Sequence, residues 1–145
     1  TVSDSLAHQA DVFATIAAIL GVEIPDDAGE DSFSLLSVLK GETDTIRESA
    51  VSCSMRGVPA YREGTWKLIL DQGSGGWSEG QDESARVQLY DLSSDISEQQ
   101  NLAAMHPERV MEMQERFEAV ITRGRSTPGP NQKNDVRVQR YPRGN

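Results

Sequence analysis

The sequence predicts an α+β fold, in which a small antiparallel sheet of about four strands packs against a C-terminal helix and is preceded by an N-terminal helix. Near both ends of the chain, apolar residues recur every three or four positions, which is typical of amphipathic helices. Between them, short runs rich in β-branched and aromatic residues are separated by glycine turns. Because these turns are short, consecutive strands are expected to pair as an antiparallel meander.

The first helix is predicted over residues 5–20, where one apolar stripe is expected to be buried. Ser3 or Asp4 is expected to cap its start, and Gly21 to end it. A short helical segment follows at 35–39. The stripe of the first helix consists of Leu6, Ala10, Phe13, Ala17 and Leu20.

The middle of the chain changes to the pattern of strands. A long glycine-rich loop, 72–80, precedes the last strand and carries Trp77. The last helix is predicted from Pro107 to Gly124, with an apolar stripe of its own. The strands are expected at 49–55, 59–61, 65–70 and 87–91, with turns at Arg56-Gly57 and Glu63-Gly64.

Composition excludes several classes of partner and site. The chain has 23 acidic and 14 basic residues, and its net charge of −9 disfavours nucleic acid, which is bound by neutralising phosphates. No apolar run approaches the roughly 20 residues of a membrane span. Cys53 is the only cysteine, which excludes an internal disulfide and a cysteine-rich zinc site. Because the chain begins at Thr1 without a methionine, we expect a processed or excised piece.

The residues alone predict no active site. His8 and His106 lie in different predicted helices; His106 is expected to be a cap, and His8 to lie on a helix surface or at a domain contact. The acidic loop 26–31 lacks the spacing of an EF-hand and is interpreted as a solvated loop. Cys53 has no histidine or acid placed by the sequence to activate it.

Five segments, in their order along the chain, resemble the end of the arylsulfatase-like sulfatase family. The most distinctive is the strand Leu89-Tyr90-Asp91-Leu92, which leads through an acidic turn with Asp95 and Glu98 to Asn101-Leu102 and the last helix. Together the five segments cover nearly the whole chain. The other four are the helix at 8–15 with Leu20-Gly21-Val22, the loop and short helix at 26–39, the hairpin at 60–69, and the tail at 124–135.

The resemblance implies a sulfuric ester hydrolase with an alkaline-phosphatase-like α/β fold. The nucleophile of that family is a formylglycine made from the first residue of a Cys/Ser-x-Pro-x-Arg motif. Cys53 is followed by Ser-Met-Arg, without the proline and with the arginine one position early, so Cys53 is not that nucleophile. Formylglycine, calcium and the sulfate-binding residues are expected in a larger N-terminal domain outside this chain. The chain alone is therefore expected to be inactive, with no catalytic and no metal-binding residue.

The same resemblance implies an organisation in three parts. Residues 1–45 would pack on the missing catalytic domain, 46–124 would form the C-terminal subdomain, and 125–145 would form an extended basic tail that wraps over a neighbouring surface or is mobile. The faces of the first helix and of the sheet that meet the absent domain are expected to be apolar and exposed, so the chain alone is expected to self-associate. The family also suggests a periplasmic or secreted location.

Arg56, Trp77 and Cys53 are the candidate substrate-binding residues. The resemblance implies that this subdomain helps to wall the substrate cleft, where a guanidinium suits an anionic sugar and an indole suits its apolar face. The alternative is that Arg56 is a charge in a turn and Trp77 packs on the sheet. For the whole chain, the alternative function is a free-standing, non-catalytic binding or interaction module of the same fold.

Overall fold

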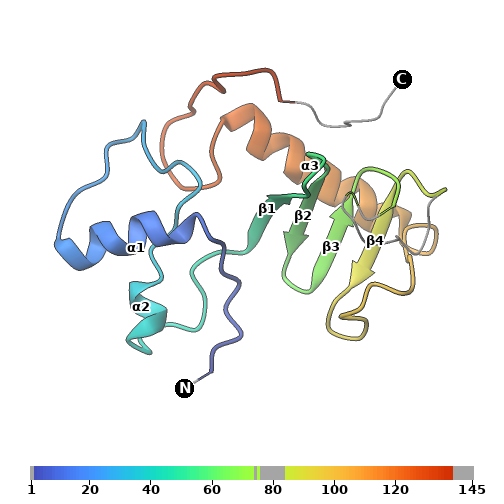
Figure 1. Ribbon diagram of the computed structural model, residues 1–145, viewed down its shortest axis with the longest axis horizontal. Helices are drawn as coiled ribbons and strands as arrows, with labels where there is room; N and C mark the ends of the chain where they lie inside the picture. The colour runs from blue at the N-terminus through green and yellow to red at the C-terminus, as the bar shows by residue number, and fades with distance from the viewer. Residues whose placement is uncertain (1, 74, 76–83, 139–145) are drawn as a thin grey trace. The chain divides into compact units, whose positions relative to one another are not determined.

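The computed structural model describes residues 2–73, 75 and 84–138 (Figure 1). This part of the chain divides into two compact units, which we call the helical unit (Thr1–Ala50 with Ala119–Val136) and the sheet unit (chiefly Val51–Glu118). None of its helices is long and apolar enough to cross a membrane. The elements are α1 (Asp11–Leu20), α2 (Leu36–Leu39), β1 (Ser49–Cys53), β2 (Pro59–Glu63), β3 (Trp66–Ile69), β4 (Gln88–Asp91) and α3 (Pro107–Arg123).

The predicted α+β class is confirmed, with four strands in the order β1-β2-β3-β4. Tyr61 lies opposite Leu68 in the antiparallel pair of β2 and β3, and Leu68 lies opposite Leu89 in that of β3 and β4. These three side chains therefore share one face of the sheet. The α3 helix packs there, with Met113 fully buried and the Phe117 ring 6.0 Å from the Tyr61 ring.

The other face of the sheet is also closed, contrary to the expectation of an exposed apolar face. Val58, Ile69 and Tyr90 form a buried cluster there, against which Ala60 and Leu92 pack. The sheet unit therefore buries apolar side chains on both faces of its sheet.

The Asn-Leu pair of the family signature continues the sheet beyond β4. The Asn101 side chain accepts a hydrogen bond from the Leu89 N–H at 3.1 Å and donates one to the Val87 carbonyl at 3.1 Å. The next backbone N–H, that of Leu102, donates to the Leu89 carbonyl. Asn101 also accepts from the Ala103 N–H. This side chain thus satisfies the edge of β4 and fixes the approach to α3.

The acidic turn of the signature is held by its own carboxylates. Asp91 accepts hydrogen bonds from the Ser93 hydroxyl and N–H, and these bonds keep the pKa of Asp91 below its usual value. Asp95 accepts from two backbone N–H groups that follow it. Glu98, in a left-handed conformation (φ 56°), pairs with Lys67 of β3 at 2.6 Å. The acidic residues of the signature therefore stabilise the turn and its contact with β3.

In the helical unit, α1 begins later than predicted. The Asp11 carboxylate reaches back to the His8 N–H at 2.7 Å, while the His8 ring nitrogen accepts from the Ala10 N–H at 3.2 Å. This reciprocal arrangement satisfies the free N–H groups at a helix start. Ser3 and Asp4 are therefore not the caps, and the residues just before α1 are held by the side chains of Asp11 and His8.

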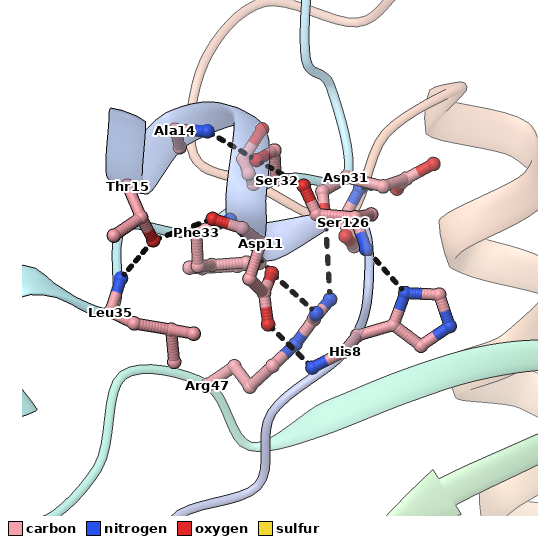
Figure 2. Close-up of polar contacts among 12 residues, drawn as sticks. His8, Asp11, Ala14, Thr15, Asp31, Ser32, Phe33, Leu35, Arg47 and Ser126 are labelled. Carbon is pink, nitrogen blue, oxygen red and sulfur yellow. Dashed lines mark hydrogen bonds and ion pairs between the residues drawn. The ribbon is translucent and has the colours of Figure 1, made fainter. Parts of the chain in front are cut away.

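The centre of the helical unit is a buried ion pair (Figure 2). The Arg47 guanidinium lies 2.8 Å from the Asp11 carboxylate, and both side chains are almost completely buried. Arg47 also donates to the carbonyls of Ser49 and Asp31, and it stacks 4.7 Å from the Phe33 ring. The Phe33 N–H donates to Asp11 as well. Each charge therefore has several partners, which a buried ion pair requires.

Two hydroxyl groups join the loop before α2 to α1. The Ser32 hydroxyl donates to the Ala10 carbonyl and accepts from the Ala14 N–H, at 2.7 and 2.8 Å. The Thr15 hydroxyl accepts from the Leu35 N–H at 2.9 Å (Figure 2). The inward side of α1 is consequently a polar surface, and the predicted buried stripe is wrong. Phe13 and Leu20 of that stripe are 52% and 69% exposed.

Of the two alternatives for the segment from residue 125, wrapping over a neighbouring surface agrees with the contacts of its first residues. Arg125 is buried and donates to the carbonyls of Asp26 and Pro130 and to the Thr127 hydroxyl. Thr127 in turn donates to the Glu30 carbonyl at 2.7 Å. The described part of the segment is therefore packed on the acidic loop. Up to Val136 it belongs to the same compact unit as Thr1–Ala50.

Replacing Asn101 with alanine is expected to destabilise the chain by about 1–3 kcal/mol, because the buried Leu89 N–H would lose its acceptor. Urea unfolding would show a lower midpoint with an unchanged slope. Gln100→Ala is the matched control, since Gln100 is exposed and uses only its backbone N–H. Equal midpoints for the two variants would refute this role of Asn101.

Arg47→Ala is expected to cost about 3–5 kcal/mol, because it leaves the Asp11 charge buried without its partner. Lys40→Ala removes one partner of an exposed pair with Glu42 and is expected to cost less than about 0.5 kcal/mol. Thermal unfolding of both variants measures the contrast. A small effect of Arg47→Ala would show that the pair contributes little to the fold.

Candidate functional site

The described residues contain no constellation with obvious catalytic chemistry. Among them, no three or more His, Cys, Asp or Glu side chains are grouped so that they could hold a metal ion. In the acidic loop, the Asp31 carboxylate accepts a hydrogen bond from the Ser126 N–H at 2.8 Å. Cys53 lacks the proline and the arginine spacing of a formylglycine motif.

The two histidines act at helix starts. His8 caps α1, and His106 precedes the first residue of α3, where its carbonyl accepts from the Val110 N–H at 3.1 Å. The His106 ring lies edge-on to Trp66 at 5.4 Å. The cap expected for His106 agrees with this position.

Trp66 is the largest aromatic side chain of the described sheet, but its ring is covered. The Arg109 guanidinium lies 4.8 Å over the ring, and His106 approaches from another direction. A hollow of about 420 Å³ opens beside them, lined by the first turns of α3 and the residues before it. Trp66 is half-buried, and its ring already makes a cation–π contact with Arg109 and an edge contact with His106.

Cys53 and Arg56 lie at the β1–β2 hairpin. Ser54 and Val58 pair across it, with the Ser54 N–H 2.9 Å from the Val58 carbonyl, and Gly57 takes the left-handed conformation that a tight turn needs (φ 78°). The Cys53 side chain is exposed, and Arg56 is exposed at the tip. The hairpin thus presents a guanidinium to solvent on a short, well-bonded turn.

The structure brings the start of the glycine-rich loop to this hairpin. The Arg56 N–H donates to the Gly75 carbonyl at 3.3 Å. A side chain at Gly75 would meet the Ser54 hydroxyl at 2.6 Å, and Gly75 also has a left-handed backbone (φ 64°). Two of the predicted site segments therefore meet, which their separation in the sequence did not show. Trp77 itself lies outside the described residues.

Gln88 of β4 anchors this loop, a role that the sequence analysis missed. Its buried side-chain amide donates to the carbonyls of Asp71 and Gly73 at 2.7 and 3.0 Å. Its oxygen accepts from the Tyr90 hydroxyl at 2.7 Å. A glutamine within a strand of otherwise apolar character was the available signal, because a buried amide needs hydrogen-bond partners.

The described part of this surface carries one cationic side chain, that of Arg56, at the tip of the hairpin. Arg56 offers a planar, permanently charged group suited to a sulfate or carboxylate. Met55, 61% exposed, adds an apolar surface beside it. Cys53 contributes an exposed thiol near the base of the hairpin.

No protein-family model matches the chain. It is 39% identical over 123 residues to the N-acetylgalactosamine-6-O-sulfatase of Bacteroides thetaiotaomicron, covering 82% of this chain and 24% of the relative. A solved structure described under the metabolism of multiple glycosaminoglycans by Bacteroides thetaiotaomicron matches 81% of this chain and 25% of its own, with 36% identity and a TM-score of 0.69.

A solved 2-O GAG sulfatase shares the fold, with a TM-score of 0.55 and 23% identity over 78% of this chain and 24% of that one. The chain thus spans about a quarter of the length of the relatives it matches. This partial coverage of the relatives agrees with a C-terminal fragment, as the signature residues indicate. In sequence and in fold, the chain therefore corresponds to the C-terminal region of bacterial sulfatases.

Proposed function

We propose that this chain is the C-terminal subdomain of an enzyme that hydrolyses sulfate esters of carbohydrates, and that it acts there as scaffold and as part of the substrate cleft wall. The observation that carries this proposal is the 39% identity to a sulfatase that acts on a sulfated amino sugar. The nucleophile, its formylglycine and the calcium ion would be supplied by the larger part of the enzyme.

The scaffold role is supported by what the signature residues do. Asn101 and Leu102 complete the edge of β4, and the turn carboxylates bond to nearby backbone and to Lys67. Such residues hold a sheet in one register without touching a substrate. The most family-like part of the chain is therefore structural, which agrees with a subdomain that is inactive by itself.

The cleft-wall role rests on the hairpin and the loop. Arg56 is exposed at the hairpin tip, and its backbone is bonded to Gly75, two residues before Trp77. A cation and an aromatic residue on adjoining segments suit a sulfated sugar, which has anionic groups and apolar faces. Gln88 holds the start of the loop, at Asp71 and Gly73, against β4.

The genomic sequence that precedes Thr1 tests the parent enzyme. We expect it to encode a large α/β domain with a Cys/Ser-x-Pro-x-Arg motif. The joined polypeptide should release sulfate from sulfated sugars, whereas the 145-residue chain should release none. A stop codon or an unrelated module before Thr1 would favour the free-standing binding module.

Arg56→Ala in the active full-length enzyme is expected to raise KM for a sulfated sugar about tenfold, because one charge-assisted contact is lost. Arg56→Lys should recover only part of the affinity, since a lysine cannot bind an anion through two parallel N–H groups. Arg62→Ala, at the opposite end of β2, is the matched control. An unchanged KM in Arg56→Ala would show that Arg56 is a charge in a turn and does not contact the substrate.

Trp77→Ala tests the glycine-rich loop separately. We expect a larger loss of affinity for the sulfated sugar than for a short alkyl sulfate, because only the sugar offers a ring face on which the indole could stack. Steady-state kinetics with both substrates measure the difference. Identical rate and specificity in Trp77→Ala would remove the loop from the substrate site.

A further inference from the structure

The polarity of α1 is reversed with respect to its own unit. Its inward side carries Asp11, Ala14 and Thr15, all buried, whereas its outward side is apolar. A surface helix normally turns its apolar stripe inward. We call the outward side the α1 apolar face; its members, between 51% and 69% exposed, are Val12, Phe13, Ile16, Ile19 and Leu20.

The helix cannot rotate to bury this face within the helical unit. Rotation would break the Asp11–Arg47 pair and the bonds of Ser32 and Thr15 to the neighbouring loop. The Phe13 ring is also held, because it lies against Gly29, where an added side chain would come within 2.7 Å. The exposure of the face is therefore fixed by buried polar contacts.

The α1 apolar face has the composition of a protein core. Asp11 is the only charged residue of α1, and it points inward. Interfaces between separate proteins usually have a polar and charged rim around their apolar centre. A helix whose solvent side has no charge is typical of one enclosed by a larger fold.

We propose that the α1 apolar face is an internal packing surface, covered by an apolar surface of the remaining part of the same sulfatase polypeptide. This inference rests on the proposed function, because the relatives are about four times as long as this chain and thus have the material to cover it. The isolated chain exposes a surface that the intact enzyme buries, so α1 couples the folding of the two parts.

The test compares Ile16→Glu, at the centre of the face, in two settings. In the 145-residue chain the variant should unfold at the same temperature as the wild type, because Ile16 is exposed there. In the full-length polypeptide it should abolish most soluble, folded enzyme, since a charge would be buried without a partner. Met111→Glu, at an exposed position on the charged side of α3, should be harmless in both settings.

Other outcomes overturn the inference. A full-length Ile16→Glu enzyme as soluble and stable as the wild type would show that the face remains exposed. Sedimentation showing a dimer of the wild-type chain that Ile16→Glu dissociates, with the full-length variant unaffected, would identify a second copy as the occupant. Neither result depends on sulfate release, so failure of this inference is distinguishable from failure of the proposed function.

Discussion

The ion pair between Asp11 and Arg47 is the contact on which the helical unit depends. It joins residues that are 36 positions apart, and it lies where the start of α1, the loop before α2 and the chain entering β1 come together. A buried pair contributes little to net stability compared with an apolar pair of the same size, but breaking it is costly. Its main effect here is to fix one orientation of α1.

That orientation determines the surface of the unit. The side chains of Asp11, Thr15 and Ser32 form hydrogen bonds with backbone groups on the inward side of α1. The apolar residues of α1 therefore face outward. An isolated domain would be expected to evolve the opposite arrangement, since exposed apolar surface favours association. The exposed apolar area would be buried if α1 packed against a further part of the same polypeptide.

The sheet unit differs from the helical unit in how it buries its apolar residues. Both of its faces bury their own apolar residues, and α3 covers the one that carries Tyr61, Leu68 and Leu89. Its edge and turns are closed by short polar contacts, of which those of Asn101 and Gln88 are the most extensive. This rigid frame holds the β1–β2 hairpin and the start of the glycine-rich loop together, so that Arg56 is presented from a fixed base.

The sequence by itself determined the α+β class, the four strands, the limits of α3 and the family, because these depend on local periodicity, glycine turns and short motifs. Tertiary structure alone decided which side of α1 is buried, since Asp11 finds its partner only at Arg47, far along the chain. It also decided that Arg125 folds back onto the acidic loop and that Gly75 meets the Arg56 hairpin. Local periodicity predicted a buried apolar stripe on α1, and local composition left open whether the segment after residue 124 wraps over a surface or is mobile. One buried ion pair and several long-range hydrogen bonds decided both points.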